Sequence, residues 1–584
     1  MASTHARPHM LLADDQGQIY DDPDLLMLCR KGHEWTLPRP DELMPLPEES
    51  ELFLLPGRRA VGLDPETGET IVDEEAWAVA AFVAPAHTLT GHPVYTTEEG
   101  APTLPLFAYA AVGMIGDRFY VCAKKVDEDP RQIFTGIPQK KINKAAKDLM
   151  AKFPKNRFIG HVMQNCVLKY GCPAAKNLAI GRYEAPIPTS RVCNARCVGC
   201  ISHKNEDSTI CATPQDRLTF RPSADDILEM MRHHMANEEQ PIFSFGQGCE
   251  GEPLTEAPLL LEVVKRFREE GGRGTINLNS NASMPDAVAQ LAEAGLSSLR
   301  VSLNSARPDV YLRYYRPTNY EFADVRRSIT EASSRGVFVS LNLLYFPGIT
   351  DCEEEIEALV ELINTCGVNF IQLRNLNIDP ELYMDLMDGI AFGPSVGLGM
   401  TRAEALKSPK LYLQMVVIIV VTACCGIQQQ IPSVLGGFGF GTAQVSTMMS
   451  FFTAVLAVGK ILQGILYSKL GPARGGAIII AVFGLSFVLL CFPGMAYPAL
   501  VALAVGMGCV TTLMPIVTRF VFGAREYAAI WSILSTASSV GSLIATPLFG
   551  MAYDATGSYT PAMAVSAVAL FVSLPILAMA FKKK

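Results

Sequence analysis

Residues 411–580 carry almost no charge, and this feature constrains the fold more than any other. Seven charged side chains interrupt the segment, which otherwise divides into apolar stretches of membrane-spanning length. A helix needs about 20 apolar residues to cross the hydrocarbon core of a bilayer. The sequence therefore predicts an all-α bundle of six transmembrane helices over 411–581, embedded in the lipid bilayer. The apolar stretches cover residues 411–433, 442–467, 475–493, 497–518, 528–551 and 560–580.

The loops between these stretches alternate in positive charge. Basic residues lie before the first stretch and after the second, fourth and sixth. The loops after the first and third stretches carry no charge, and the loop after the fifth carries only Asp554. Lysine and arginine concentrate in the cytoplasmic loops of membrane proteins. We therefore expect a multi-pass protein of the cytoplasmic membrane, with the N-terminal half and the C-terminus both in the cytoplasm.

The first 400 residues have the opposite character. The chain holds 49 basic and 58 acidic side chains, and residues 401–584 account for 11 of the basic and 3 of the acidic ones. The first 400 residues are therefore strongly acidic, which argues against a nucleic-acid partner because such partners select basic surfaces. The first 15 residues show no apolar leader, so we expect a cytosolic half in which the clustered cysteines indicate metal chemistry rather than disulfides.

Residues 1–160 predict a small α+β accessory domain. Residues 107–115 and 118–123 have the pattern of a hairpin that turns at Gly116-Asp117, and residues 140–153 have the pattern of a helix. The segment contains no recognisable chemical motif. Its expected role is therefore accessory, or in substrate recognition.

Residues 183–385 alternate short apolar strands with amphipathic helices. Such alternation indicates parallel strands joined by right-handed crossovers. Six units predict an α/β fold, an open (βα)6 partial barrel whose chemistry lies at the carboxyl ends of the strands. Residues 386–410, with several glycines and basic side chains, form the expected linker to the membrane bundle. The expected strands are 187–192, 241–245, 275–279, 298–303, 337–345 and 369–373, and the expected helices lie near 223–236, 255–270, 284–294, 321–335 and 351–365.

Three cysteines, Cys193, Cys197 and Cys200, lie within eight residues directly after the first expected strand. Three thiolates on one short loop can converge on a single soft-metal site. A structural zinc ion would take a fourth protein ligand, for which His203 and Cys211 are available. An iron–sulfur cluster can instead leave one iron without a protein ligand. The residues alone leave both readings open.

The spacing Cys-x3-Cys-x2-Cys after the first strand of an open βα barrel resembles that of the radical S-adenosylmethionine (radical SAM) enzymes, over about residues 183–385. The resemblance implies that Cys193, Cys197 and Cys200 hold three irons of a 4Fe–4S cluster, while the fourth iron binds S-adenosylmethionine (SAM). It also implies a low-potential electron donor of the flavodoxin or ferredoxin type. Reductive cleavage of SAM then gives a 5′-deoxyadenosyl radical, whose substrate the resemblance does not name.

Four further segments are similar to that family, in the same order. Residues 248–254 resemble the turn that holds the methionyl amino group, and residues 280–282 resemble the segment after the third strand. Residues 300–305 lie where a serine and a polar partner approach the ribose, and residues 344–351 contain a Pro-Gly turn. Gly199 departs from the family, which usually has an aromatic residue there. The resemblance assigns SAM contacts to Gly251, Glu252, Pro253, Asn281, Ser302 and Asn304.

Arg374 follows the sixth expected strand, at the catalytic face. Its guanidinium could clamp a carboxylate or phosphate of the substrate, or form a salt bridge that closes the barrel rim. Four further cysteines, Cys166, Cys172, Cys211 and Cys249, would form a second cluster only if they converged. Buried or free thiols are the default expectation for them.

The membrane segment, about 401–584, resembles the C-terminal half of a major facilitator superfamily transporter. Residues 464–474 are similar to that family's loop between two helices, with Ser468 in place of the usual aspartate. The nearest group is of the oxalate/formate antiporter type, although residues 536–540 lack its pathway lysine. Lys460, inside the second stretch, is a candidate pathway cation for an organic anion, or a lysine that snorkels to the interface.

A transporter of that superfamily needs two six-helix halves, and this chain has one. A homodimer through the half-transporter would supply the second. The first hypothesis is a radical SAM enzyme tethered to the cytoplasmic face of the membrane. The second is a subunit of an organic-anion transporter with a regulatory soluble domain. The third is a fusion of two fragments that have no joint function.

Overall fold

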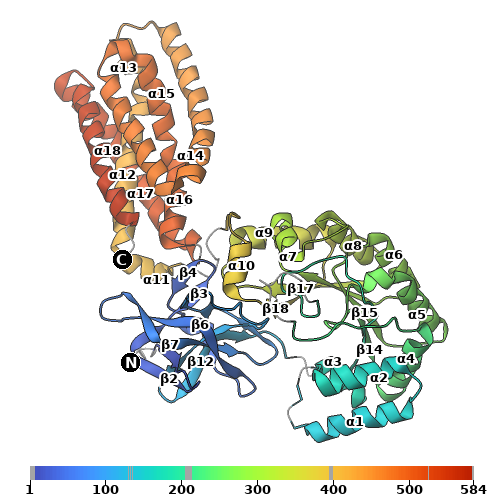
Figure 1. Ribbon diagram of the computed structural model, residues 1–584. Helices are drawn as coiled ribbons and strands as arrows, with labels where there is room; N and C mark the ends of the chain where they lie inside the picture. Colours follow the sequence, from blue (N-terminus) through green and yellow to red (C-terminus); the bar gives the residue numbers. More distant parts are fainter. Residues whose placement is uncertain are drawn as a thin grey trace. The chain divides into compact units, whose positions relative to one another are not determined.

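The computed structural model describes residues 7–128, 131, 133–134, 136–203, 213–392, 399–523 and 525–581. The chain forms two compact units, Met1–Ser395 and Val396–Lys584 (Figure 1). The second unit has a hydrophobic core of its own, and so does the α/β part of the first.

The first unit opens with antiparallel strands, which in the described residues form a nine-stranded and a three-stranded sheet. The predicted hairpin is confirmed, because β11 and β12 pair antiparallel with Met114 opposite Phe119. Small apolar side chains such as Ala80, Ala110 and Val121 fill the interior. The strands are β1 (His9–Ala13), β2 (Ile19–Met27), β3 (Cys29–Lys31), β4 (Glu34–Thr36), β5 (Leu43–Pro45), β6 (Glu51–Leu63), β7 (Thr70–Phe82), β8 (His87–Leu89), β9 (His92–Pro93), β10 (Tyr95–Thr97), β11 (Ala110–Ile115) and β12 (Arg118–Lys125).

The helices that follow this sheet in the chain pack on the α/β part. Ile142, Ala146 and Leu149 of the predicted helix α1 are buried in the core of the following α/β part. Within the expected α+β segment 1–160, the strands therefore end at Lys125, and the apolar stripe of α1 packs on the α/β part. The helices are α1 (Gln139–Lys152), α2 (Arg157–His161), a π-helix (Val162–Lys169) and α3 (Pro173–Ala179).

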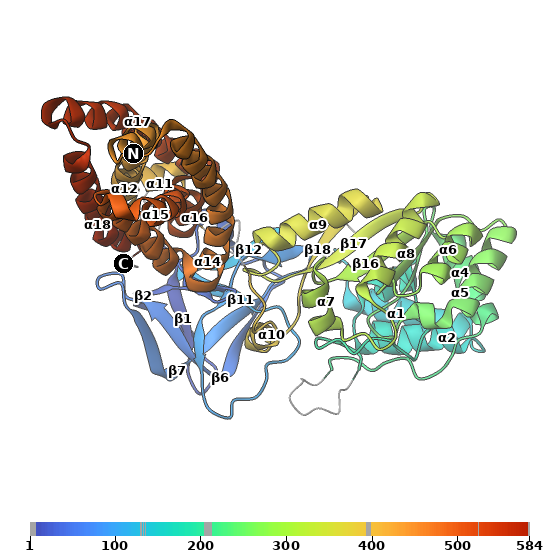
Figure 2. The ribbon, with the colours of Figure 1, turned by 90° about the horizontal axis from the view of Figure 1, so that it is seen from above.

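The α/β part confirms the predicted alternation of strands and helices. In this part of the described chain six parallel strands follow one another in sheet order, from β13 to β18. Helices α5, α6 and α8 lie along the outer side of the sheet (Figures 1 and 2). The strands are β13 (Glu184–Ile187), β14 (Ile242–Phe245), β15 (Thr275–Ser280), β16 (Ser298–Leu303), β17 (Phe338–Tyr345) and β18 (Phe370–Asn375). The helices are α4 (Ala224–Asn237), α5 (Ala257–Glu269), α6 (Pro285–Ala294), α7 (Pro308–Tyr315), which the sequence does not predict, α8 (Phe322–Ser334), α9 (Glu353–Cys366) and α10 (Pro380–Leu386).

The first parallel strand differs from its prediction, because it ends at Ile187 rather than at residue 192. Beyond it the amides of Thr189 and Ser190 donate to the carboxylate of Glu250, at 2.6 and 2.7 Å, instead of extending the sheet. The apolar pattern of the sequence therefore continues into a turn, and that turn leads to the cysteine loop.

The two faces of the parallel sheet differ in polarity. Leu299, Val301 and Leu303 of β16 are fully buried in the apolar core. The alternate residues Arg300 and Ser302 line a cavity on the other face, since successive side chains of a strand point to opposite sides. The helix-covered face therefore supplies stability, and the opposite face is available for chemistry.

The N-terminal sheet is bonded to the last parallel strand. Asn375 of β18 accepts from the amide of Leu89 and donates to the carbonyl of His87, both at 3.0 Å, so its side chain imitates a strand partner for β8. Arg58 and Asp379 form an ion pair at 3.0 Å in which both side chains are 3% exposed. Removing one partner of such a buried pair is strongly destabilising. The N-terminal sheet is therefore held in a fixed position against the edge of the α/β part at β18.

In the second unit, the elements longer than an isolated bridge among the described residues are all helices. The described residues contain six helices that are long and apolar enough to cross a membrane, as the sequence predicts. Helix α14 contains two of these spans, joined at Gly471, whose φ of 74° interrupts the helix just before Pro472. The spans are Pro409–Gln429, Thr442–Tyr467, Leu470–Leu490, Pro493–Phe522, Tyr527–Thr556 and Thr560–Phe581. The helices are α11 (Arg402–Lys407), α12 (Pro409–Cys425), α13 (Ile431–Gly437), α14 (Thr442–Leu490), α15 (Ala496–Met507), α16 (Cys509–Phe522), α17 (Tyr527–Thr556) and α18 (Thr560–Phe581).

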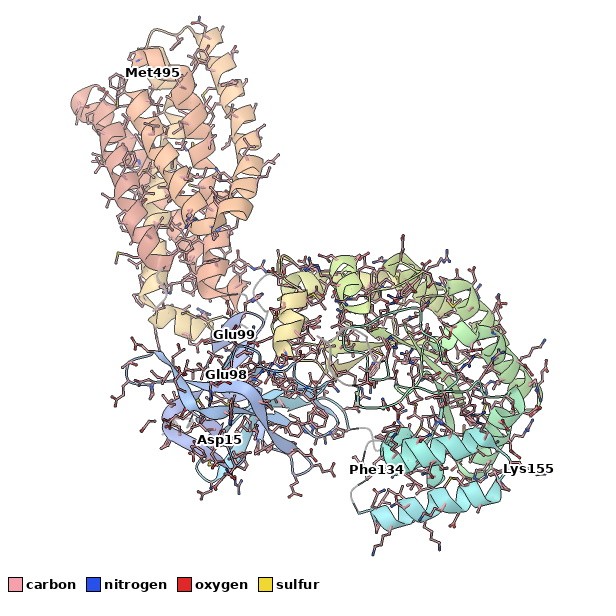
Figure 3. All side chains as sticks on the ribbon, in the orientation of Figure 1. Asp15, Glu98, Glu99, Phe134, Lys155 and Met495 are labelled. Carbon is pink, nitrogen blue, oxygen red and sulfur yellow. The ribbon has the colours of Figure 1, made fainter. Side chains whose placement is uncertain are left out.

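Two polar side chains of this helical unit, Gln414 and Lys460, differ in burial. Gln414 is fully buried and donates to the hydroxyl of Thr518 at 2.6 Å. Lys460 is exposed on the surface of the unit, so a pathway through this unit's own core does not include it. Met495 lies at one end of the unit, in the 3-10 turn that begins the fourth span (Figure 3).

Candidate active site

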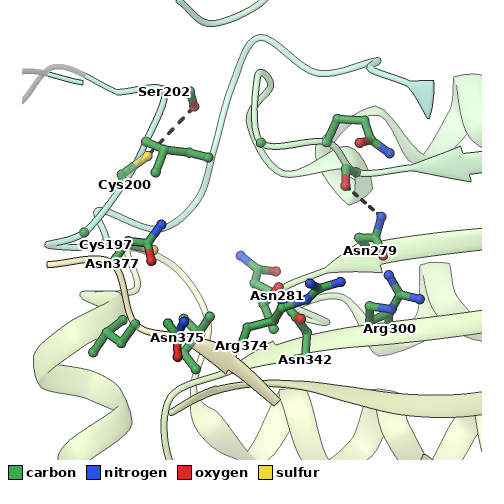
Figure 4. A pocket seen from close by; sticks show the side chains of 18 of the residues that line it. Cys197, Cys200, Ser202, Asn279, Asn281, Arg300, Asn342, Arg374, Asn375 and Asn377 are labelled. Atoms are coloured by element: carbon green, nitrogen blue, oxygen red, sulfur yellow. Dashed lines mark hydrogen bonds between the residues drawn. The ribbon is translucent and has the colours of Figure 1, made fainter. Parts of the chain in front are cut away.

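A cavity of about 640 Å³ lies at the carboxyl ends of the parallel strands of the first unit. Its lining comes from the cysteine loop, the turns after β14 and β15, the inner side chains of β16 to β18, and residues 82–87 of the N-terminal sheet (Figure 4). Asn304 is absent from this lining. The expected site residues that line it are Cys193, Cys197, Cys200, Gly251, Glu252, Pro253, Asn281, Ser302 and Arg374.

The cysteine loop is held by the segment that follows α7. The amide of Val198 donates to the carbonyl of Tyr314, and the amide of Thr318 donates to the carbonyl of Asn194, both at 3.0 Å. Arg316, within that segment, has a φ of 46°, a left-handed conformation that residues other than glycine rarely adopt. Such strain persists where the surrounding structure fixes it. The backbone of the loop is therefore set by these bonds.

The three thiols lie in a buried setting with one guanidinium nearby. Burial raises the pKa of Cys193 to about 11 and the pKa of Cys197 well above its usual value. Both thiols are therefore protonated at neutral pH, and a metal must displace those protons on binding. A guanidinium nitrogen of Arg217 donates to the sulfur of Cys200 at 3.6 Å.

The side chains around the loop bear on the choice between an iron–sulfur cluster and a zinc ion. Among the residues that the structure describes, no three His, Cys, Asp or Glu side chains are gathered closely enough to hold one metal ion. A 4Fe–4S cluster needs a wider set, because each thiolate binds a different iron. Of the two expected zinc ligands, His203 is exposed and lies outside the cavity lining, and Cys211 lies outside the described residues.

The turn after β14 packs directly against the start of the cysteine loop. The amide of Gly251 donates to the carbonyl of Ser190 at 2.8 Å, and the amide of Glu252 donates to the carbonyl of Val192 at 2.9 Å. A side chain at position 251 would place its Cβ 1.9 Å from the carbonyl oxygen of Val192. Glycine is therefore required for the two segments to approach this closely.

The substitution Gly251→Ala is expected to displace the cysteine loop, because no Cβ can sit 1.9 Å from a backbone oxygen. Overpacking of this kind costs about 1–3 kcal/mol, and the loop is the part that must move. Iron analysis after anaerobic reconstitution should show a substoichiometric content. The matched control is Gly160→Ala in α2, where the added Cβ meets nothing within 4 Å. A full iron content in Gly251→Ala would show that the close approach does not matter.

Glu252 is buried, and its carboxylate already has three donors. It accepts from the amide of Leu254 at 3.0 Å, the hydroxyl of Ser280 at 2.5 Å and the amide of Asn281 at 2.8 Å. Burial raises its pKa to about 7 in spite of these bonds. A carboxylate offers about four lone-pair sites, so one remains for an N–H donor in the cavity. The three protein bonds are not predictable from the motif.

Glu250 is a second buried carboxylate, to which the sequence motif assigns no role. It accepts from the amides of Thr189, Ser190 and Gln247 at 2.6 to 2.7 Å. Burial raises its pKa to about 7. Glu250 therefore ties the turn after β14 to the end of β13, which positions Glu252 in the cavity.

Asn281 and Ser302 line the cavity, and Asn304 does not. The side-chain amide of Asn281 donates to Oδ1 of Asn194 at 2.9 Å, which joins the end of β15 to the cysteine loop. The assignment of Asn304 to the ribose is corrected: its side chain is buried and donates to the hydroxyl of Tyr383 at 3.2 Å. Strand β16 ends one residue before it, so the alternation of side chains does not reach it.

The space at Gly199 is filled from another element. A Cβ at position 199 would lie 2.7 Å from the hydroxyl oxygen of Tyr314, which is 4% exposed and lines the cavity. Tyr314 belongs to α7, more than a hundred residues along the chain. The departure from the family pattern at position 199 therefore has a compensating side chain that local sequence does not reveal.

The remaining cysteines of the first unit stay separate from the three in the loop. The sulfurs of Cys166 and Cys249 lie 3.9 Å apart, and the amide of Cys172 donates to the carbonyl of Cys166 at 2.7 Å. None of these three described cysteines forms a disulfide. Cys211, the fourth of that set, lies outside the described residues.

Comparison with known proteins places the site in context. Residues 187–363 match the family model of the Radical SAM superfamily. A probable GTP 3′,8-cyclase of Pyrobaculum aerophilum is 27% identical over 142 residues, which cover 24% of this chain and 45% of the relative. A GTP 3′,8-cyclase of Limosilactobacillus fermentum is 26% identical over 195 residues, which cover 32% of this chain and 52% of the relative. The chain thus spans about half the length of these curated relatives.

Among solved structures, methylornithine synthase is 14% identical, with a TM-score of 0.26 over 44% of this chain and 72% of that one. The cofactors of the Radical SAM superfamily are a 4Fe–4S cluster and S-adenosylmethionine. The cysteine loop and the turn at Glu252, which line one cavity, fit these two groups. The chain therefore contains a radical SAM domain and is an enzyme, whose reaction these matches do not specify.

Proposed function

We propose that this chain is a radical SAM enzyme that cleaves S-adenosylmethionine reductively and acts on an unassigned substrate, while its second unit attaches it to the cytoplasmic membrane. One observation carries the proposal: three segments far apart in the sequence meet at one cavity. They are the cysteine loop, the turn at Glu252 and the end of β15 at Asn281. Direct hydrogen bonds join each of these segments to another.

The proposed architecture of the α/β part is an open (βα)6 partial barrel. Its support is the sequential parallel order of β13 to β18, together with a cavity on the polar inner face. The N-terminal sheet covers the edge at β18 through Asn375 and through the buried Arg58–Asp379 pair. This cover excludes water from one side of the cavity, which protects a reactive intermediate.

The residues of this chain would position the two cofactors. When bound, the cluster and SAM supply a 5′-deoxyadenosyl radical for hydrogen abstraction. Cys193, Cys197 and Cys200 would each ligate one iron, which leaves one iron without a protein ligand. Glu252 would accept an N–H from the amino group of SAM with its remaining lone-pair site, and Ser302 would contact the ribose. We propose that an external protein of the flavodoxin or ferredoxin type delivers the electron.

The test is SAM cleavage by the full-length chain, purified anaerobically in detergent. With dithionite, the wild type should form 5′-deoxyadenosine and methionine in equal amounts. Glu252→Gln should weaken SAM binding by about tenfold or more, because one charge-assisted hydrogen bond is lost. The matched control is Glu262→Gln, since Glu262 pairs with Arg266 on the exposed side of α5. An iron-replete wild type that forms no 5′-deoxyadenosine would contradict the proposal.

For the second unit we propose the C-terminal half of a major-facilitator fold, with both of its ends in the cytoplasm. The six candidate spans and the alternation of basic loops support this proposal. A second function, transport of organic anions by a homodimer, is favoured by the exposed position of Lys460 within the second span, where a second unit could enclose it. Saturable oxalate or formate uptake by proteoliposomes, lost in Lys460→Ala, would support transport, and no uptake would leave the unit as an anchor.

A further inference from the structure

The cavity has a polar floor that the proposed cleavage of SAM does not use. Asn279, Arg300, Asn342 and Arg374 come from the four successive strands β15 to β18, and all four line the cavity. The register sets Asn279 directly opposite Arg300. Figure 4 labels all four side chains and shows Asn279 in a hydrogen bond to the neighbouring turn at Gly246. The side-chain amide of Asn279 already donates to the carbonyls of Phe245 and Gly246, and the polar character of the floor as a whole suits a strongly polar ligand.

Two of these side chains are guanidiniums. Arg300 and Arg374 lie on the strands that flank β17, and both side chains are directed into the same cavity (Figure 4). The planar fork of a guanidinium matches the geometry of a carboxylate or a phosphate.

The carboxylates that line the cavity have donors from other parts of the chain. Glu250 and Glu252 are held by the backbone amides described above. Asp127, from the N-terminal sheet, accepts from the side-chain amide of Gln372 at 3.2 Å. These bonds fix the acidic groups at the cavity wall and at the turn after β14.

The opposite wall of the cavity is apolar and comes from the N-terminal sheet. Val83, Ala84, Pro85 and Ala86 all face it. Ala86 has a φ of 71°, which is unusual for a residue other than glycine, and its carbonyl accepts from the amide of Val126 at 2.9 Å. Backbone strain of this kind concentrates at ligand sites, where the surrounding structure holds it in place. The backbone of this segment is therefore held in one conformation, and it forms one wall of the cavity.

We propose that this part of the cavity is the substrate subsite, and that it takes a molecule with a carboxylate or phosphate group. Arg300 and Arg374 bind the oxyanion, and an apolar part of the molecule lies against residues 83–86. The N-terminal sheet is then a specificity element of the enzyme. This inference rests on the proposed function, because it places the substrate in the same cavity as the source of the radical.

The test uses the full-length chain in detergent, with its cluster reconstituted. Isothermal titration calorimetry measures the binding of two probes, inorganic phosphate and glutarate, with S-adenosylhomocysteine present at saturation. At least one probe should bind saturably at millimolar concentrations. Arg300→Gln and Arg374→Gln should each weaken it by about tenfold or more, and Arg374→Lys should weaken it less, since it keeps the charge and loses the fork. The matched control is Arg326→Gln, because Arg326 pairs with Glu361 between the outer helices.

The outcomes separate the subsite from the proposed function. A comparison of phosphate binding with glutarate binding distinguishes a phosphate site from a carboxylate site. Near-ultraviolet circular dichroism shows that each variant is folded. Absence of saturable binding, or binding unchanged in both arginine variants, would overturn the subsite. Binding that S-adenosylhomocysteine abolishes would also overturn it, because the guanidiniums would then serve the cofactor. Formation of 5′-deoxyadenosine by the wild type is measured in parallel and tests only the proposed function.

Discussion

Cys197→Ala is expected to abolish both iron binding and SAM cleavage. Cys197 is the central member of the loop, and its sulfur lies close enough to Cys193 and Cys200 for their charges to affect its pKa. Two remaining thiolates would hold only two irons, which cannot retain a 4Fe–4S cluster with an open iron. The wild type should bind about four irons per chain, and the variant close to none.

The matched control for this experiment is Cys366→Ala. Cys366 is a buried free cysteine at the end of α9 and lies outside the cavity lining. Its variant should keep the iron content and the 5′-deoxyadenosine yield of the wild type. Stoichiometric zinc and no iron in the wild type would contradict the account of the cysteine loop.

Removal of residues 393–584 is expected to move the chain from the membrane fraction to the soluble fraction. The second unit exposes large apolar side chains along its helices, including Leu543 at 77%, Met551 at 70% and Ile461 at 68%. A soluble protein rarely tolerates so much exposed apolar surface, whereas lipid covers it. The full-length chain should therefore resist extraction by alkaline carbonate, and the shortened chain should not need detergent.

Sidedness is tested in the full-length chain with two added cysteines. Met495→Cys lies in the 3-10 turn that begins the fourth span, and Ala473→Cys lies in the first turn of the third span. The distribution of basic loops predicts that a membrane-impermeant thiol reagent labels Met495→Cys in intact cells and labels Ala473→Cys only after lysis. The unmodified chain gives the background. The reverse pattern would mean that the unit has the opposite orientation.

Features that depend on local pattern could be predicted from the sequence. Strand β16 was expected at 298–303 and spans Ser298–Leu303, because its alternation is strict and its neighbours are helical. The six apolar spans were predictable because hydropathy alone defines them. The cysteine loop was predictable because its spacing is rare and because it follows a strand.

Features that depend on tertiary contacts could not be predicted. The end of β13 is set by the buried carboxylate of Glu250, which lies more than 60 residues further along the chain. The space at Gly199 is filled by Tyr314, and one wall of the cavity comes from residues 82–87. Asn304 lies directly after β16, and its side chain donates to Tyr383 of α10, a partner that its place in the sequence does not reveal. No local periodicity encodes such partners, since each depends on which segments the fold brings together.

The central claim is that one chain combines radical SAM chemistry with attachment to a membrane. The most direct measurement is anaerobic flotation of native membranes, followed by an assay of each fraction for 5′-deoxyadenosine after addition of SAM and dithionite. The account predicts a single species of about 63 kDa in the membrane fraction, and 5′-deoxyadenosine formation that coincides with it. Two shorter species, with the activity in the soluble fraction, would contradict it.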